Sequence, residues 1–475
     1  MSGPGKTGLP RWAGGVIVAL FAVVVFLLGM FAVSIMEHRW EAQRPAIALQ
    51  PVDEWETDNA VYGENYPREY DGYLKTKIDD TRTMYGGAYP RDYLEEDPYQ
   101  VILFAGYGFS QEYRQARGHY HAIEDVTETK RIKKPVNPAT CWTCKSPDVP
   151  RLMAEMGTKE FYGSNFHDLA DEIVNPIGCR DCHDPESMKL VITRPALREA
   201  YAARGRDIDE VTHQEMRSLV CAQCHVEYYF LNDPAEGKKD YLTLPWVKGT
   251  SVDEMIAYYD EYGFSDYIHP ISGTPIIKSQ HPDYEVFSTG IHAYRNVACA
   301  DCHMAYVAEG GMKVSDHHVQ SPLLNISNSC AVCHRWTEDE IRSRIESIQT
   351  MCYTARMAAE EALVKAHFDV GAAAQSGASG QELSAIRTTL RHAQFKWDYI
   401  ASNNGMGFHS PQEYLRIAGE SRSQALEVRL FAARLLVEKG YADTPVYPDI
   451  STREKAWKVA SAFVNGKGAN LLSRH

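Results

Sequence analysis

The cysteines of this chain restrict what it can fold into more than any other feature. Ten of the eleven cysteines lie in five Cys-x-x-Cys pairs, and a histidine directly follows four of these pairs. Zinc ribbons also use Cys-x-x-Cys, but they have no need of a histidine at the next position. Disulfide scaffolds are far shorter than 475 residues. The paired cysteines are Cys141 and Cys144, Cys179 and Cys182, Cys221 and Cys224, Cys299 and Cys302, and Cys330 and Cys333, with His183, His225, His303 and His334 after the last four pairs.

Cys-x-x-Cys-His is the attachment signature of c-type haem. Two thiols one short turn apart can form thioethers to one porphyrin edge, and the histidine then presents its imidazole to the iron. We therefore expect five covalently bound haem c groups. The pairs follow one another so closely that these haems must share one protein shell, within reach for electron transfer. The longest interval, between Cys221 and Cys299, is where we expect something other than haem attachment.

The first pair differs from the others because Lys145 follows it in place of histidine. A lysine amine that binds iron must be deprotonated, which a low dielectric and the charge of the metal both favour. A haem with two histidine ligands has no free coordination position and only passes electrons. The haem that is built differently is therefore where we expect an open position and chemistry. A degenerate haem site or a structural cysteine pair is the alternative.

An uncharged apolar run covers residues 13–36. About 20 such residues cross a bilayer as a helix. Lys6 and Arg11 precede the run, so residues 1–12 are expected in the cytoplasm and the rest of the chain outside it. The run exceeds the roughly 7–15 apolar residues of a signal peptide, which favours an uncleaved anchor over a cleaved signal. Both interpretations export the same domain.

The charge balance excludes one large class of function. The chain has 49 Lys and Arg against 63 Asp and Glu, a net charge of −14, and no basic face of the kind that nucleic-acid binders carry is expected. The basic residues of the exported part are densest just before the lysine motif, where we expect a positive approach path for an anion. This cluster consists of Lys130, Arg131, Lys133 and Lys134.

The fold is expected to be mainly α, with haems packed in the N-terminal and central region and long helices at the C-terminus. Residues 37–335 are expected to form a haem-binding catalytic region, which from about residue 52 is rich in Gly, Pro, Tyr and Asp and has only short helical patterns. Residues 336–475 are expected to be a long-helix region of the same globular unit, contributing one haem ligand. The helices are expected from Thr337 to about Phe368, from Ser379 to about Asn403 and from about Ser410 to Lys439, with capping boxes at Thr337 and Ser379 and a Gly/Ala/Ser linker from Gly371 to Gly380. Their apolar residues suit a core or a dimer interface.

At this point the sequence resembles a known family, the ammonia-forming pentahaem cytochrome c nitrite reductases. The resemblance covers about residues 98–455, and the N-terminal apolar run lies outside it. The motifs that carry it are CWTCKSPDV, CHVEYYF, KSQHPDYE, TGIH before CADCHM, and PDISTREKA.

The resemblance implies roles for individual residues. Lys145 corresponds to the proximal ligand of the active-site haem, and Arg131, Tyr228 and His281 to the residues of its distal pocket. Calcium is implied at Glu227, at Gln280 and at the main-chain carbonyls of Tyr228 and Lys278. Carboxylate, amide and main-chain oxygens are the ligands that calcium prefers. The second haem ligands implied are His119 for the haem of His225, His292 for that of His334, His317 for that of His183 and His409 for that of His303, with His121 and His318 as adjacent alternatives.

The implied function is the periplasmic six-electron reduction of nitrite to ammonium. A membrane quinol-oxidising multihaem cytochrome would donate the electrons, and the enzyme would be a homodimer held at the inner membrane by its N-terminal helix. A pure electron-transfer cytochrome is one alternative, but it would need neither the lysine ligand nor the residues from Glu227 to His281. A hydroxylamine-oxidising multihaem enzyme is another, and it would be expected to carry more haems and only histidine motifs.

Overall fold

The computed structural model describes residues 11–42, 49–132, 135–309, 311–441 and 445–472. The chain divides into two compact units, which are formed by residues 1–50 with 306–315 and by residues 51–305 with 316–475. The expected mainly α fold is confirmed, and the described residues contain only three two-stranded sheets. The expected border between residues 335 and 336 stays a prediction.

The first unit contains one long helix and one hairpin. Helix α1 (Arg11–Ala42) includes a stretch, Trp12–Glu37, that is long and apolar enough to cross a membrane and is not buried by the protein. This stretch contains the expected run at residues 13–36, and it suits either a membrane anchor or a signal sequence. Strands β5 (Tyr306–Glu309) and β6 (Met312–Ser315) form the antiparallel hairpin.

The second unit begins with short elements, as the sequence predicts. Its helices before residue 305 are α2 (Asn59–Asn65), α3 (Pro67–Lys75), α4 (Tyr93–Glu96), α5 (Tyr99–Leu103), α6 (Ala122–Glu128), α7 (Asp148–Met156), α8 (Thr158–Gly163), α9 (Cys179–Cys182), α10 (Pro195–Ala203), α11 (His213–Ala222), α12 (Val252–Tyr262), α13 (Asp283–Ser288), α14 (Ile291–Tyr294) and α15 (Cys299–His303). Strand β1 (Tyr229–Asp233) pairs with β2 (Lys238–Thr243), and β3 (Tyr267–Ile268) pairs with β4 (Pro275–Ile276), both antiparallel.

Two of the cysteine pairs are themselves single helical turns, α9 and α15. In each, an aspartate at the third position of the motif caps its own helix. The Asp181 carboxylate accepts a hydrogen bond from the Gly178 amide at 2.8 Å, and the Asp301 carboxylate accepts one from the Ala298 amide at 2.8 Å. The caps satisfy amide groups that such a short helix leaves without partners.

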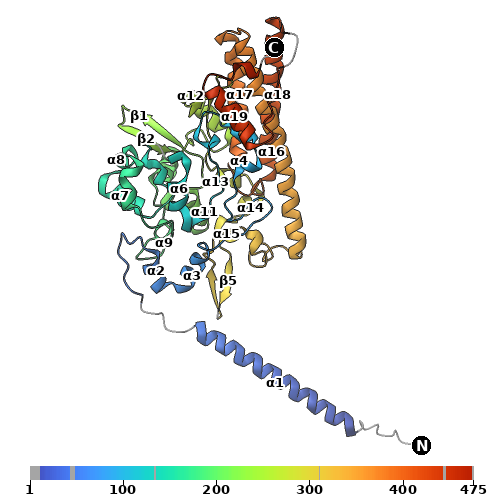
Figure 1. The fold of residues 1–475 in the computed structure, drawn as a ribbon. Helices are drawn as coiled ribbons and strands as arrows, with labels where there is room; N and C mark the ends of the chain where they lie inside the picture. Colours follow the sequence, from blue (N-terminus) through green and yellow to red (C-terminus); the bar gives the residue numbers. More distant parts are fainter. Residues whose placement is uncertain (1–10, 43–48, 133–134, 310, 442–444, 473–475) are drawn as a thin grey trace, which may run out of the picture. The chain divides into compact units, whose positions relative to one another are not determined.

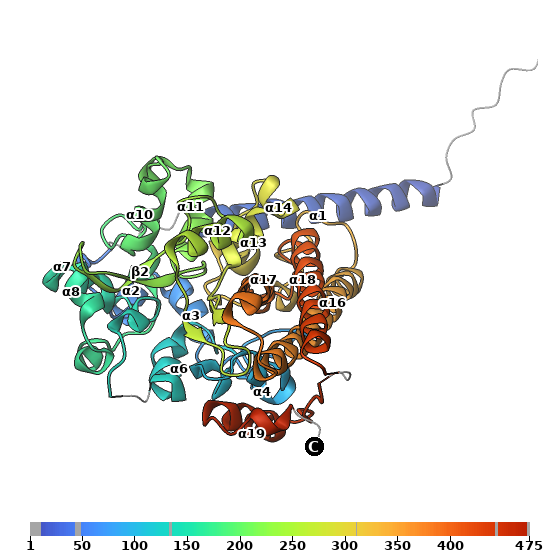
Figure 2. The ribbon, with the colours of Figure 1, turned by 90° about the horizontal axis from the view of Figure 1, so that it is seen from above.

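The C-terminal part of this unit is a group of long helices, α16 (Glu338–Gln375), α17 (Gly380–Ala401) and α18 (Pro411–Glu438), followed by α19 (Arg453–Val464). The capping boxes expected at Thr337 and Ser379 are confirmed. Helix α18 packs along both α16 and α17, while α19 packs on α5 (Figure 1). Figure 2 looks nearly along the three long helices and shows them side by side.

The expected linker from Gly371 to Gly380 is wrong in its first half, because α16 continues to Gln375. Gly371 lies against the main chain of Ile271, where an added Cβ would come within 2.7 Å of the carbonyl oxygen. Ala372 and Ala373 are buried. The small residues therefore allow a close approach inside the core, where the sequence alone suggests flexibility. Helix α19 was not predicted.

Trp397 of α17 joins the elements of the C-terminal core. Its ring is fully buried, its centre lies 5.6 Å from that of Phe104, and its indole N–H donates to the Glu360 carboxylate of α16 at 2.8 Å. The large ring supplies apolar burial, and its N–H satisfies a buried carboxylate oxygen, so both of its properties stabilise the same contact.

We expect Trp397→Ala to lower the free energy of unfolding by about 3–5 kcal/mol, because it leaves a cavity and a poorly satisfied carboxylate. Denaturant titration of the holoprotein, followed by far-UV circular dichroism, measures this. Trp457→Ala is the matched control, since Trp457 is 53% exposed and should cost less than about 0.5 kcal/mol. Equal losses in the two variants would contradict the packing described for Trp397.

Candidate functional site

The five cysteine pairs lie close to one another in the fold. None of the described cysteines forms a disulfide, and Cys352, the cysteine outside the pairs, is a buried thiol. The sulfur of Cys144 is within hydrogen-bonding distance of that of Cys224, and Cys221 is similarly close to Cys299. The pair at 221–224 therefore lies between the lysine motif and the pair at 299–302.

Three of the expected histidine partners face the histidines of the motifs. A metal–imidazole bond is about 2.0 Å long, with the nitrogen about 1 Å from its ring centre, so two imidazoles on opposite sides of one iron should have ring centres about 6 Å apart. The observed distances between ring centres are 6.3 Å for His183 and His317, 6.3 Å for His303 and His409, and 6.4 Å for His292 and His334.

Three motif histidines have one ring nitrogen fixed by a protein acceptor. The Nδ1 atom of His183 donates to the Met188 carbonyl at 2.8 Å, and that of His303 to the Gln320 carbonyl at 2.9 Å. His225 donates through Nδ1 to the Asp283 carboxylate at 3.0 Å. A donor at Nδ1 fixes the tautomer and leaves Nε2 with a lone pair for a metal. These histidines therefore suit haem iron.

The structure also separates the neighbouring histidines that the sequence leaves as alternatives. Both ring nitrogens of His121 are engaged, with Glu124 and the Lys77 carbonyl, and Nε2 of His318 is engaged with Asp79. Enclosure by protein, with a contribution from the nearby His225 and Lys145, lowers the pKa of His119 to about 4. His119 therefore lies beside the histidine that it is expected to partner.

The residues expected around the odd haem come together near Cys141 and Cys144. Burial raises the pKa of Tyr228 well above its usual range, the nearby Cys144 and Cys141 contribute to the rise, and Arg131 opposes it. Arg131 lies over the ring of Phe109 at 4.2 Å, and its Nε donates to the Thr129 hydroxyl at 3.2 Å. Among the described residues no carboxylate forms an ion pair with Arg131, so its charge is available to an anion.

His281 completes this group from the other side. The centre of its ring is 6.1 Å from that of His225. The ring is accessible by surface area, yet surrounding protein lowers its pKa to about 3, and the positive charge of His225 contributes. The exposed surface of the ring and its low pKa are both explained by a ring that faces an open space inside the protein. A neutral imidazole in such a place can accept a proton or donate a hydrogen bond.

Asp283 is a functional residue that sequence reasoning missed. Besides His225, its carboxylate accepts from the Asn403 side chain and from the Asn404 amide, both at 2.7 Å. Burial would raise the pKa of Asp283, but His225 and the other histidines nearby outweigh it and hold the pKa at about 2. Asp283 lies two residues after His281 in the motif KSQHPDYE, so that motif could have indicated it.

Three of the four residues expected to bind calcium are in contact. The Gln280 amide N–H donates to the Glu227 carboxylate at 2.7 Å, and its side-chain amide donates to the Lys278 carbonyl at 3.1 Å. Glu227 is 0% exposed, and burial raises its pKa to about 8. The Lys278 ammonium pairs with Asp398 at 2.8 Å, so Glu227 has only hydroxyl and amide donors.

A buried carboxylate without a cation is costly, and a divalent ion at Glu227 would remove that cost. The oxygens of Gln280 and Lys278 beside it are of the kind that calcium takes. The site residues therefore fit calcium. For the expected approach path, Lys130 is exposed, while Lys133 and Lys134 lie outside the described residues.

Cysteine pairs held at single helical turns, with imidazoles paired at the spacing of a six-coordinate iron, define a multihaem c-type cytochrome. A family model described as cytochrome c552 matches residues 58–470, and the chain belongs to this family.

Relatives named cytochrome c-552 agree with the family. The one from Bacteroides fragilis is 48% identical, covering 94% of this chain and 91% of its own, and the one from Porphyromonas gingivalis is 45% identical, covering 97% and 93%. The catalytic subunit of the cytochrome c nitrite reductase of Desulfovibrio desulfuricans, a structure with two calcium sites, matches with a TM-score of 0.79 and 31% identity over 85% of this chain and 91% of that one.

We expect the purified holoprotein to carry five covalent haems per chain, because each cysteine pair lies beside a nitrogen ligand. The pyridine haemochrome assay, combined with protein quantification and intact mass, measures this number. Cys141→Ala with Cys144→Ala should reduce it by one and leave the other four. Four haems in the unmodified protein would show that the lysine motif holds none.

Proposed function

We propose that this protein is a periplasmic ammonia-forming cytochrome c nitrite reductase with its active site at Lys145. The observation that supports this most strongly is the gathering of Lys145, Arg131, Tyr228 and His281 around one cysteine pair. A cytochrome that only passes electrons needs no such group. The match to the enzyme of Desulfovibrio desulfuricans supports the same reaction.

When bound, the haem of the 141–144 pair supplies an iron with an open coordination position and delivers electrons there. Lys145 is proposed as its proximal ligand, and the other residues act on the opposite side. Nitrite is an anion, and the Arg131 guanidinium can hold its oxygens by charge-assisted hydrogen bonds. Phe109 and Thr129 orient that guanidinium.

Reduction of nitrite to ammonium consumes six electrons and eight protons, so the pocket must deliver protons repeatedly. His281 is neutral at physiological pH because its pKa is low, and it can relay a proton without holding a charge beside Arg131. The Tyr228 hydroxyl stays protonated because burial raises its pKa, and it donates a hydrogen bond to a bound oxygen. Each residue therefore keeps one protonation state between proton transfers.

The motif at 221–224 would hold the haem that passes electrons to the haem of the lysine motif. The pair at 221–224 is close to the lysine motif at Cys224 and to the pair at 299–302 at Cys221. Haems attached to these three pairs would therefore be held close to one another. The remaining haems are proposed to be held by the histidine pairs at 6.3–6.4 Å. His119 is proposed as the partner of His225.

Calcium is proposed at Glu227, Gln280 and the carbonyls of Tyr228 and Lys278. Such an ion would touch the residue that carries the catalytic tyrosine and the residue before His281. It would therefore hold both sides of the pocket and add positive charge where an anion binds.

The partners follow from the surface and the N-terminus. Helix α18 exposes Leu426, Leu430, Phe431 and Val437. A second copy of the chain covering these residues would form a homodimer through the long helices. The apolar stretch of α1 is proposed as an uncleaved anchor in the inner membrane, which would keep the enzyme beside a membrane quinol-oxidising multihaem cytochrome as its electron donor.

We expect Lys145→His to retain five haems but to lower nitrite turnover, because imidazole donates differently to the iron and so changes the opposite coordination position. Ammonium formed per nitrite, with a chemical reductant, measures the activity. Lys159→His is the control, because Lys159 is exposed on α8 and, among the described residues, its ammonium donates only to the Glu236 carbonyl. Absence of ammonium in the unmodified protein would contradict the proposed reaction, and equal turnover in Lys145→His would contradict the role of the lysine.

We expect Glu227→Gln to lose calcium and at least about tenfold in turnover, because calcium affinity depends on the number of ligand charges. The spectra of the histidine-ligated haems should not change, since none of their ligands is touched. Metal content by mass spectrometry, measured together with turnover, tests this directly and avoids slow chelation. Glu236→Gln is the matched control, since this glutamate is exposed and ion-paired only to Lys238. A variant with full calcium and full activity would remove Glu227 from the calcium site.

A further inference from the structure

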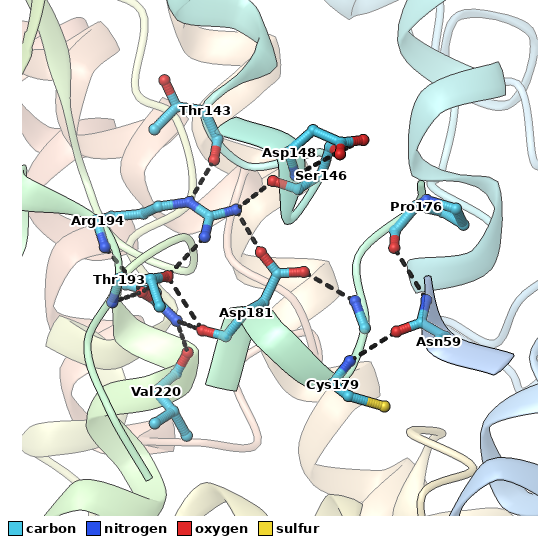
Figure 3. A network of polar contacts seen from close by, with 12 residues as sticks. Asn59, Thr143, Ser146, Asp148, Pro176, Cys179, Asp181, Thr193, Arg194 and Val220 are labelled. Atoms are coloured by element: carbon cyan, nitrogen blue, oxygen red, sulfur yellow. Dashed lines mark hydrogen bonds and ion pairs between the residues drawn. The ribbon is translucent and has the colours of Figure 1, made fainter. Parts of the chain in front are cut away.

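One arginine outside the proposed active site is buried at the meeting point of three haem-attachment motifs. Arg194 is 1% exposed and lies just before α10. Figure 3 shows its guanidinium directed between Thr143, Ser146 and Asp181. A buried guanidinium is retained only when its donors have partners, and all three of its nitrogens are hydrogen-bonded here.

Two of these bonds hold the chain on either side of Lys145. The Nε atom of Arg194 donates to the Thr143 carbonyl at 2.7 Å, and Nη2 donates to the Ser146 carbonyl at 2.8 Å. Thr143 lies inside the first cysteine pair, and Ser146 follows the lysine directly. The fixed planar fork of the guanidinium therefore sets the main chain that presents the Lys145 side chain.

A third bond reaches the second motif. The same Nη2 donates to the Asp181 carboxylate at 2.5 Å, and Asp181 also caps the turn of the 179–182 pair through the Gly178 amide. The ion pair is enclosed on both sides, since the side chains are 1% and 5% exposed. Solvent screens such a pair very little.

The third motif joins through Gln223, which lies inside the 221–224 pair. Its side-chain amide donates to the Asp181 carbonyl at 2.8 Å, and its oxygen accepts from the Arg194 main-chain amide at 3.2 Å. The Thr193 hydroxyl accepts from Arg194 at 2.6 Å and donates to the Asp181 carbonyl at 3.1 Å. The polar network is therefore continuous across the three motifs.

We propose that Arg194 is a positioning residue for the reaction, which fixes the Lys145 segment relative to the motifs at 179–182 and 221–224. The inference rests on the proposed function of the lysine motif. Its consequence is that the open haem keeps one ligand geometry and one distance to the haem that supplies its electrons. Small displacements at a distance from a reacting centre can cost about a hundredfold in rate.

A second arginine–aspartate pair shows what is particular to this one. Asp301 occupies the same place in the 299–302 motif and pairs with Arg217 of α11, but the carboxylate is 29% exposed. Arg217 belongs to the helix that carries Cys221, so this ion pair joins the motifs at 299–302 and 221–224. Of the two arginines, Arg194 is the one whose hydrogen bonds reach the lysine motif.

The test uses Arg194→Lys in the full-length holoprotein. Lysine keeps the charge but has a single nitrogen, so it cannot hold both carbonyls and the carboxylate together. We expect five haems, kcat for nitrite lowered by at least about tenfold and KM within about twofold, because nitrite itself is not contacted. The electron paramagnetic resonance lines of the lysine-ligated haem should broaden. Arg198→Lys is the matched control, one turn further on, 39% exposed and paired with Asp209.

Gln223→Leu is the second variant, because it leaves the ion pair between Arg194 and Asp181 intact and removes only the side-chain hydrogen bonds that join the 221–224 motif to the network. We expect the same changes at smaller size. Wild-type kcat together with wild-type resonance lines in Arg194→Lys would overturn the inference. If Arg194→Lys fails to mature, wild-type kcat and wild-type resonance lines in Gln223→Leu would overturn it instead. If the unmodified protein forms no ammonium, the proposed function fails. The resonance lines and the rate of electron equilibration among the haems then decide the role of Arg194 by themselves.

Discussion

Covalent attachment at five places between residues 141 and 333 is the constraint on which the rest of the fold depends. Each attachment point fixes two cysteines one turn apart, and the chain must bring a second nitrogen ligand to the far side of each iron. Long regular elements cannot do this at such short intervals, so α9 and α15 are single turns that begin at Cys179 and Cys299. The long helices, which carry no attachment motif, build one apolar core, and the short elements around the motifs build another.

Buried polar contacts add to the apolar packing around the motifs. Buried charges are compensated in different ways at neighbouring points. Asp398 has the Lys278 ammonium, and Asp283 has His225 and two asparagines. Glu227 has neutral donors only, which is why its pKa rises while that of Asp283 falls. Of these three carboxylates, the one without a cationic partner is the one expected to bind a metal ion.

The composition of the central region predicted its short elements, and the apolar periodicity with the capping boxes at Thr337 and Ser379 predicted the long C-terminal helices and hence the mainly α fold. The sequence could not predict where α16 ends, because a run of glycine and alanine is typical of a linker. Only the structure shows that Gly371 packs against the main chain of Ile271. Sequence spacing also could not choose between His119 and His121, since the choice depends on which ring is already hydrogen-bonded. Arg194 carries no local signal, because its partners come from three distant motifs.

The motif at 221–224 combines functions that would otherwise need separate segments. Within a few residues it provides a haem attachment, the His225 ligand, the Glu227 carboxylate and the Tyr228 hydroxyl. Cys224 lies beside Cys144, so the group proposed to pass electrons and the tyrosine proposed to act on nitrite belong to one stretch of chain. Asp283 orients His225 from the segment that also contains His281. Any displacement of this stretch would therefore change electron delivery and proton delivery together, which explains why so many buried polar contacts converge on it.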